Sequence, residues 1–161
     1  MLLTIGAIAI LGGVILGVNK NINNTDTILL HSNIGIEEIS LASSVMEEAQ
    51  GLAFDEITDT SSVSATSQLT PATALGQENG DPTDLNDFDD FNGLGNNGRL
   101  EIDTLATGIY YVYTRVCYVD QNNPMTNSST RTWNKRLDVW VWNTLSTDTV
   151  KMQTVFCYWP F

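Results

Sequence analysis

Five aspartates lie close together in one loop-like stretch of the sequence, where the carboxylates of four of them could bind a cation. Residues 77–98 are rich in Asp, Asn and Gly, with Asn86 and Asn92 nearby. Closely spaced oxygen ligands on a turn-rich backbone are typical of a Ca²⁺ site. The spacing does not follow the EF-hand pattern, and the alternative is that these side chains cap turns. The candidate calcium ligands are Asp84, Asp87, Asp89 and Asp90.

The two cysteines, Cys117 and Cys157, are the other residues with distinctive chemistry. They are too few and too far apart for a zinc site, and the only histidine, His31, is remote from both. If the domain is exported, we expect one disulfide between them, because disulfides persist in oxidising compartments. The bond would cross two strands if those strands are neighbours, and would otherwise tie loops or strand ends. The alternative is a pair of buried free thiols.

The sequence offers no pairing of a nucleophile with a base. The single histidine lies in a predicted helix. The pairs of adjacent acidic residues lie in the same predicted helix and in the acidic loop rather than across a cleft. Catalysis needs such groups within hydrogen-bond reach of one another. We therefore expect no enzymatic activity, no catalytic residues and no cofactor other than calcium.

The net charge of -12 belongs to the first two thirds of the chain. Residues 1–103 hold two basic and sixteen acidic side chains, whereas residues 104–161 hold five basic and three acidic ones. An acidic surface repels phosphate backbones, so we expect no nucleic-acid partner.

An uncharged apolar block, LLTIGAIAILGGVILGV, occupies residues 2–18. As a helix it would span about 25 Å, at the short limit for a bilayer core. A signal anchor for an exported domain carries basic residues before the apolar block, yet the only nearby cation, Lys20, follows it. Either a basic leader has been removed before Met1, or the C-terminal domain stays inside, and we favour the first.

Glycines are concentrated within the apolar block. They let neighbouring helices approach closely, although each weakens an isolated helix by about 1 kcal/mol. We expect helix–helix packing through this block, and the alternative is a plain lipid anchor. The four glycines are Gly6, Gly12, Gly13 and Gly17.

Three further regions follow from composition and periodicity. Residues 19–57 continue the helix with an amphipathic pattern, so that one long helix covers 1–57. Residues 58–98 are a Ser/Thr-rich and then acidic loop. Residues 99–161 contain three or four strands, rich in Val, Tyr, Trp and Thr. The expected fold is α+β, with the long helix packed on an antiparallel sheet.

Aromatic side chains are numerous in the predicted strands. They could form a ligand surface, or they could be core residues and subunit contacts. We favour the second interpretation, because a thin helix-on-sheet domain needs large side chains to bury enough area. The residues concerned are Tyr110, Tyr111, Trp133, Trp140, Trp142 and Trp159.

The order of these parts resembles a mature type IV pilin or a type II secretion pseudopilin. The architectural resemblance covers the whole chain, and in sequence it is strongest over residues 1–57. There the segment SLASSVMEEAQ at 40–50 looks like the middle of a pilin helix. The segment DFDDFNG at 87–93 is similar to an acidic loop of some pilin-like proteins.

The resemblance implies a structural role. A peptidase would remove a basic leader and methylate the amine of Met1, and assembly machinery would extract subunits from the inner membrane. The N-terminal helices would then form the core of a homo-oligomeric filament on a bacterial or archaeal cell surface. A C-terminal disulfide is common in this family. The alternatives are a minor pilin or pseudopilin, and a membrane-tethered extracytoplasmic binding module.

Two positions depart from the family pattern. The family usually carries a glutamate at the fifth mature position, which pairs with the N-terminal amine, whereas this chain has Ile5. Thr4 offers only a hydroxyl, which is a weaker partner for an amine. The usual helix-breaking proline is also missing, and glycines and asparagines between 12 and 24 could loosen the helix instead.

Overall fold

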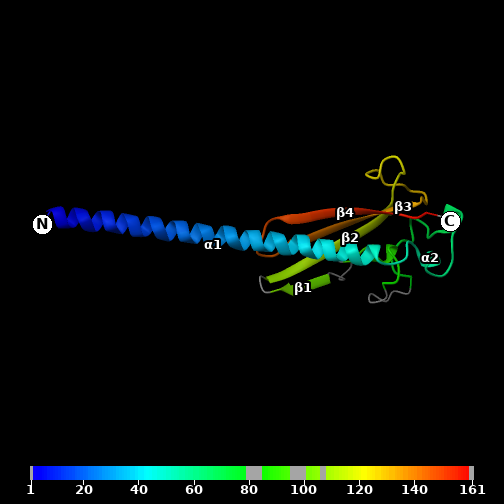
Figure 1. Cartoon of the computed structure of the whole chain (residues 1–161), viewed down its shortest axis with the longest axis horizontal. Coiled ribbons are helices and arrows are strands. Elements are labelled where there is room, and N and C mark those ends of the chain that lie inside the picture. The colour runs from blue at the N-terminus through cyan, green and yellow to red at the C-terminus, as the bar shows by residue number, and fades with distance from the viewer. Residues whose placement is uncertain (1, 79–84, 95–100, 106–107, 160–161) are drawn as a thin grey trace.

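A long helix runs beneath one face of a four-stranded antiparallel sheet and extends far beyond it (Figure 1). This computed structural model describes residues 2–78, 85–94, 101–105 and 108–159. The predicted α+β fold, a long helix packed on three or four antiparallel strands, is confirmed. The elements are α1 (Leu2–Gln50), α2 (Glu56–Thr60), η1 (Thr66–Gln68), η2 (Asp89–Phe91), β1 (Glu101–Leu105), β2 (Gly108–Tyr118), β3 (Asn134–Asn143) and β4 (Thr149–Cys157).

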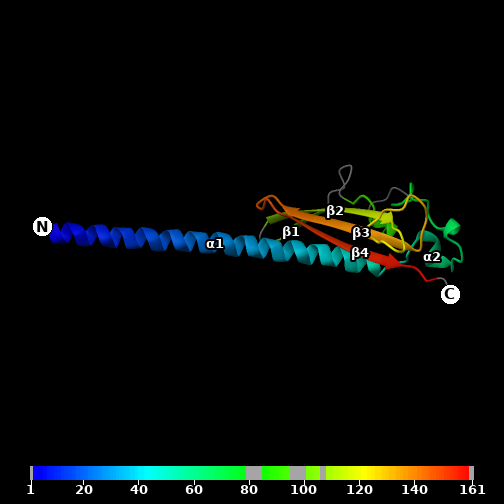
Figure 2. The same ribbon diagram turned by 90° about the horizontal axis from the view of Figure 1, so that it is seen from above.

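Helix α1 has two parts with different surroundings. Its 49 residues make a rod of about 74 Å at 1.5 Å per residue. From residue 4 to residue 33 every position is exposed except Gly12, which is half-buried. The remaining part lies along the sheet, as the view from above shows (Figure 2). The predicted amphipathic character of 19–57 is therefore realised only from Ile34 onward.

One stripe of α1 faces the sheet. Its buried positions, Ile34, Glu38, Ala42 and Ala49, recur at spacings of four and seven, which places them on the same side of a helix. The two alanines are fully buried, and their small side chains let the helix backbone lie close to the strands. The stripe joins the main hydrophobic core with valines and leucines from the inner face of the sheet.

The helix ends at Gln50, seven residues earlier than predicted. The amide of Gly51 donates to the carbonyl oxygens of both Glu47 and Glu48, at 3.1 and 3.0 Å, which closes the last turn. A separate short helix, α2, then begins after Asp55, whose carbonyl accepts the amide of Thr58 at 2.7 Å. The chain thus turns away from the α1 axis before the predicted helix end.

The sheet is a simple meander in the order β1-β2-β3-β4, with each strand antiparallel to its neighbour. All four strands lie within residues 99–161, where three or four were predicted, and the shortest of them is β1. Alternation along the strands gives one face to the core and the other to the side away from α1. The inner face carries Val112, Val116, Leu137, Val139 and Val141, all buried.

The DFDDFNG segment fastens the preceding loop to β2. Phe88 and Phe91 are fully buried in the main core. The side chain of Asn92 accepts the amide of Val116 and donates to the carbonyl of Leu75, both at 2.9 Å. Gly93 has a φ of 83°, a conformation that favours glycine. The described part of the predicted surface loop 58–98 is therefore partly a packed structural element.

Glu38 is the one carboxylate on the buried stripe of α1. It is 1% exposed, and its Oε1 has no hydrogen-bond partner. Burial raises the pKa of Glu38 above its ordinary 4.5, an effect that a hydrogen bond from the backbone of Asn143 opposes and the charge of Asp148 reinforces. Because the pKa of Glu38 is higher in the folded state, the free energy of unfolding falls as the pH rises from about the unfolded pKa of this group through its folded pKa.

We predict that Glu38→Gln raises the free energy of unfolding at pH 7 by about 1 kcal/mol, because it removes an unpaired buried charge. The gain should shrink towards pH 4, where the carboxyl of the wild-type chain is protonated. Denaturant unfolding of the full chain in mild detergent between pH 4 and 8 measures both effects. Glu48→Gln, at an exposed position, is the matched control. Equal stability of Glu38→Gln and wild type across this range would contradict the prediction.

Candidate functional site

The exposed apolar surface of α1 is the largest feature that the fold leaves uncovered. Within the described residues, no segment packs on positions 4–33. The helix is long and apolar enough to cross a membrane by length and composition. Large apolar side chains that are more than half exposed are Ile5, Ile8, Ile10, Leu11, Val14, Ile15, Leu16, Val18, Ile22, Ile28 and Leu29.

No contact within the described chain requires glycine at the four glycine positions of the apolar block. A Cβ added at Gly6, Gly12, Gly13 or Gly17 would meet no atom within 4 Å apart from the helix itself. Thr4 and Ile5 are exposed on the same helix, whereas Met1, the predicted processing site, lies outside the described residues. The chain alone therefore explains neither the glycines nor the apolar surface between them.

A second site lies at the opposite end of α1, where the ammonium of Lys135 is buried. From β3 it donates to the carbonyl of Phe54 at 2.7 Å, to Oδ2 of Asp55 at 2.8 Å, and to Oδ1 of Asp89. The rings of Phe54 and Tyr118 face it, with their centroids 4.5 and 5.4 Å from Nζ. This one side chain joins β3 to the α1–α2 connection and to η2.

The aspartates of the DFDDFNG segment organise their own turn. Oδ1 of Asp87 accepts the amides of Asp89 and Asp90, at 2.7 and 3.1 Å. Oδ2 of Asp90 accepts the amides of Asn86 and Asp87, at 2.8 and 3.2 Å. The alternative that these side chains cap turns is thus confirmed for Asp87 and Asp90.

Turn capping uses only some of the carboxylate oxygens. Oδ2 of Asp87, Oδ2 of Asp89 and Oδ1 of Asp90 are buried without a hydrogen-bond partner. Burial and the neighbouring charge of Asp89 raise the pKa of Asp87 to about 8, although Lys135 opposes the shift. Burial also raises the pKa of Asp89, again against Lys135. Buried carboxylates without partners are costly unless a proton or a cation neutralises them.

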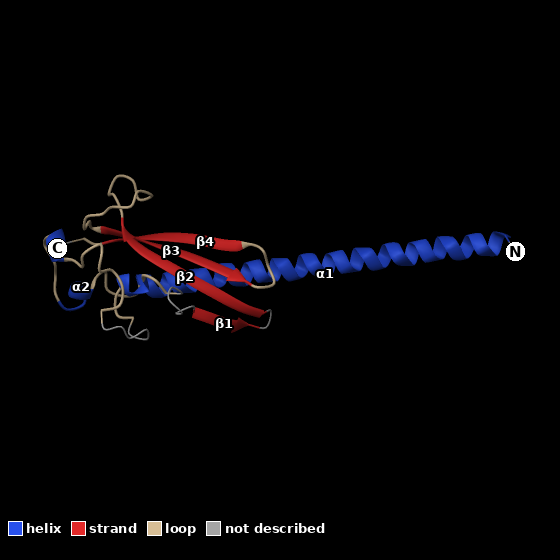
Figure 3. Cartoon of the chain, turned by 180° about the vertical axis from the view of Figure 1, so that it is seen from behind, coloured by secondary structure: helices blue, strands red, loops and turns tan. Residues whose placement is uncertain are grey.

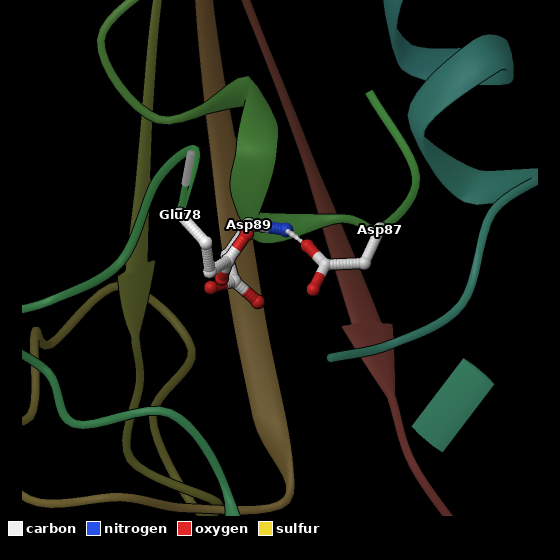
Figure 4. Close-up of side chains that lie close together, drawn as sticks. All are labelled: Glu78, Asp87 and Asp89. Carbon is white, nitrogen blue, oxygen red and sulfur yellow. Dashed lines mark hydrogen bonds between the residues drawn. The ribbon is translucent and has the colours of Figure 1, made fainter. Parts of the chain in front are cut away.

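The structure brings together two of the four predicted calcium ligands and adds one that the prediction missed. Oxygens of Glu78, Asp87 and Asp89 lie within 4.8 Å of one another (Figure 4). Asp90 is not in this group, and Asp84 lies outside the described residues. Glu78 was missed because it precedes the aspartates in the sequence, and only the three-dimensional structure shows that it lies beside Asp87 and Asp89.

The predicted disulfide between Cys117 and Cys157 is not formed, and both thiols are free. Cys117 lies on β2 opposite Arg136, and Cys157 lies on β4 opposite Asn134, so the whole of β3 separates them. Two strand spacings amount to about 10 Å, beyond the Cα separation of a disulfide. The prediction was wrong because β3 lies between the two cysteines and keeps them too far apart to bond, even near the ends of their strands.

Aromatic residues divide between the two faces of the sheet. Tyr110 is buried on the inner face, as the core interpretation expected. Tyr111 stacks on Trp142, with ring centroids 5.7 Å apart, and Tyr113 packs on Trp140 at 5.1 Å, both on the face away from α1. These rings are half-buried against one another, and they form an aromatic outer surface along β2 and β3.

The chain matches no protein-family model, no curated protein and no solved structure in comparisons of these three kinds.

We predict that Lys135→Met lowers the free energy of unfolding by about 3–5 kcal/mol, because it leaves buried carboxylates without their ammonium. Lys151→Met is the matched control, since Lys151 is exposed and its Nζ lies 5.1 Å from the centroid of the Trp140 ring. It should cost less than about 1 kcal/mol. Urea unfolding of the two full-length variants measures the difference. Similar losses in both would show that the buried ammonium does not stabilise the domain.

Proposed function

We propose that this chain is a non-enzymatic structural subunit of an extracellular helical filament of the type IV pilus class. The observation that carries the proposal is the uncovered surface of α1 between residues 4 and 33, where large apolar side chains are exposed and most of them lie between Ile5 and Val18. Copies of the same helix are the partners that would cover it in the assembled state. Before assembly, the inner membrane would cover its apolar block.

The magnitude of the uncovered surface supports association rather than a free helix in water. Burial of one Val, Leu or Ile side chain contributes about 1.5–3 kcal/mol. Eight such side chains lie between Ile5 and Val18, and each is more than half exposed. Their full burial corresponds to a contribution of about 12–24 kcal/mol, so this segment requires lipid or protein around it.

A lipid environment and a helix bundle favour different helix surfaces. Because lipid tails are as apolar as leucine, helices leave lipid for one another mainly through close packing. Glycines at positions 6, 12, 13 and 17 expose backbone with open space around it, which allows such close packing. This feature favours a helix bundle over a plain anchor.

The shape of the chain suits a filament with helices inside and sheets outside. The sheet domain covers only the C-terminal part of α1, and the N-terminus lies at the far end of the rod (Figure 3). Parallel copies could therefore bring their N-terminal segments together while their wider sheet domains stack around the bundle. In that arrangement the aromatic face along β2 and β3 points away from the bundle.

Ile5 gives the proposed filament a distinct registration mechanism. It is 64% exposed and carries no charge, so it cannot attract the N-terminal amine of a neighbour. Registration would then depend on the fit of apolar side chains against the glycines. This feature suits a minor or divergent subunit of the filament as well as a major one.

A membrane-tethered binding module is the second candidate, because the same helix is long and apolar enough to cross a bilayer. In that case α1 would only anchor the domain, and the aromatic outer face would bind the ligand. The two candidates differ in oligomeric state. A tethered module stays monomeric in mild detergent, whereas a filament subunit is recovered in filaments sheared from the cell surface.

Negative-stain imaging and mass spectrometry of sheared surface material test the proposal, with Gly13→Leu as the diagnostic variant. We predict filaments that contain this chain from wild-type cells, and at least tenfold fewer from Gly13→Leu cells, because the larger side chain prevents close helix packing. Val14→Leu, at the adjacent position, adds one methylene without filling a glycine site and should assemble normally. Immunoblotting of membranes checks that all three chains accumulate equally.

Recovery of filaments from Gly13→Leu at the wild-type level would contradict packing through the glycines. If the wild-type chain is absent from sheared filaments and remains monomeric in the membrane, the filament proposal fails and the tethered module takes its place.

A further inference from the structure

The buried charges around Lys135 do not balance. Asp55, Asp87, Asp89 and Asp90 are each at most 1% exposed. In the described part of the chain, the only ion pairs to these four carboxylates come from Lys135, which pairs with Asp55 and Asp89. An excess of buried carboxylates is unfavourable unless a proton or another positive charge joins them.

Each of the unpartnered oxygen atoms of Asp87 and Asp89 belongs to a carboxylate whose other oxygen is fixed by hydrogen bonds. Asp89 binds Lys135 through Oδ1 and leaves Oδ2 unpartnered. Asp87 accepts two backbone amides through Oδ1 and leaves its own Oδ2 unpartnered. Both side chains are fully buried. Each therefore presents one free acceptor from a fixed position, which a bound cation would use.

Glu78 completes the group from the protein surface. Its carboxylate points towards that of Asp89, beside Asp87 (Figure 4). Ligand oxygens from the three residues lie within 4.8 Å of one another. Two oxygens that share one Ca²⁺ at 2.3–2.6 Å can be no more than about 5 Å apart, so this spacing fits a single ion. Because Glu78 is exposed, an ion could enter from solvent on its side.

We propose that Glu78, Asp87 and Asp89 form a binding site for one Ca²⁺ ion. All three donors are carboxylates, and the group contains neither histidine nor cysteine, a donor set that selects hard cations over zinc or copper. Three protein ligands leave the remaining positions to water, and Ca²⁺ tolerates the irregular geometry that Mg²⁺ does not. The site does not depend on filament formation.

The ion would hold the loop that contains Glu78 against η2. Asp89 also binds Lys135 of β3, and Asp87 caps the turn that begins η2. A cation on these residues would therefore connect the loop after η1, the DFDDFNG segment and the sheet. Since Lys135 lies on the other oxygen of Asp89, its charge limits the affinity without occupying the same position.

Calcium titration of the chelator-treated full chain in mild detergent tests the site. Calorimetry should detect one Ca²⁺ per chain, and saturating Ca²⁺ should raise the melting temperature by about 5 °C relative to EDTA. Mg²⁺ at the same concentration should bind at least tenfold more weakly.

Glu78→Gln is the diagnostic variant, because Glu78 is exposed and its replacement should not disturb folding. It should weaken Ca²⁺ binding at least tenfold while leaving the melting temperature in EDTA unchanged. Glu47→Gln makes the same charge change at an exposed position of α1 and should bind Ca²⁺ like the wild type.

Three results would overturn the proposal. The first is no calcium heat and equal melting temperatures in Ca²⁺ and EDTA. The second is undiminished binding by Glu78→Gln, which would place the ion elsewhere. The third is a higher melting temperature of Asp87→Asn in EDTA together with no calcium binding by the wild type, which would show that no Ca²⁺ ion offsets the cost of burying this carboxyl group.

Discussion

The structure depends on one constraint, which is the apolar surface that α1 cannot bury within its own chain. From residue 4 to residue 33 the helix has no cover in the described structure, and its first half, up to Val18, is uncharged and predominantly apolar. A helix that is apolar on all sides is stable only inside protein or lipid. Because the sheet domain covers only the C-terminal part of α1, the apolar block stays exposed in the described structure of one copy.

The C-terminal part of α1, in contrast to the exposed N-terminal part, packs tightly against the sheet. Ala42 and Ala49 bring the helix close to the strands, and Lys135 joins the end of α1 to η2 through Asp55 and Asp89. A rigid junction of this kind fixes the direction in which the rod leaves the domain. The proposed cation would strengthen the same junction, which connects the electrostatics of the loop with the geometry of assembly.

The fold was largely predictable because its signals are periodic and local. An uncharged block, a helical spacing and alternating strands predict a helix on a sheet without any knowledge of the turns. The sites were less predictable because they depend on which segments become neighbours. Strand order decided that Cys117 and Cys157 remain apart, and loop folding decided that Glu78 joins Asp87 and Asp89. Neither result can be predicted from the spacing of these residues along the chain.

The most direct test of the central claim identifies what covers α1 in the assembled state. A photo-reactive amino acid at Leu11, which is 62% exposed in the single chain, would be cross-linked on living cells before the surface material is sheared and separated by denaturing electrophoresis. We predict covalent dimers and higher multimers of this chain, joined through the N-terminal segment. Cross-links to lipid alone, or to a different protein alone, would contradict it.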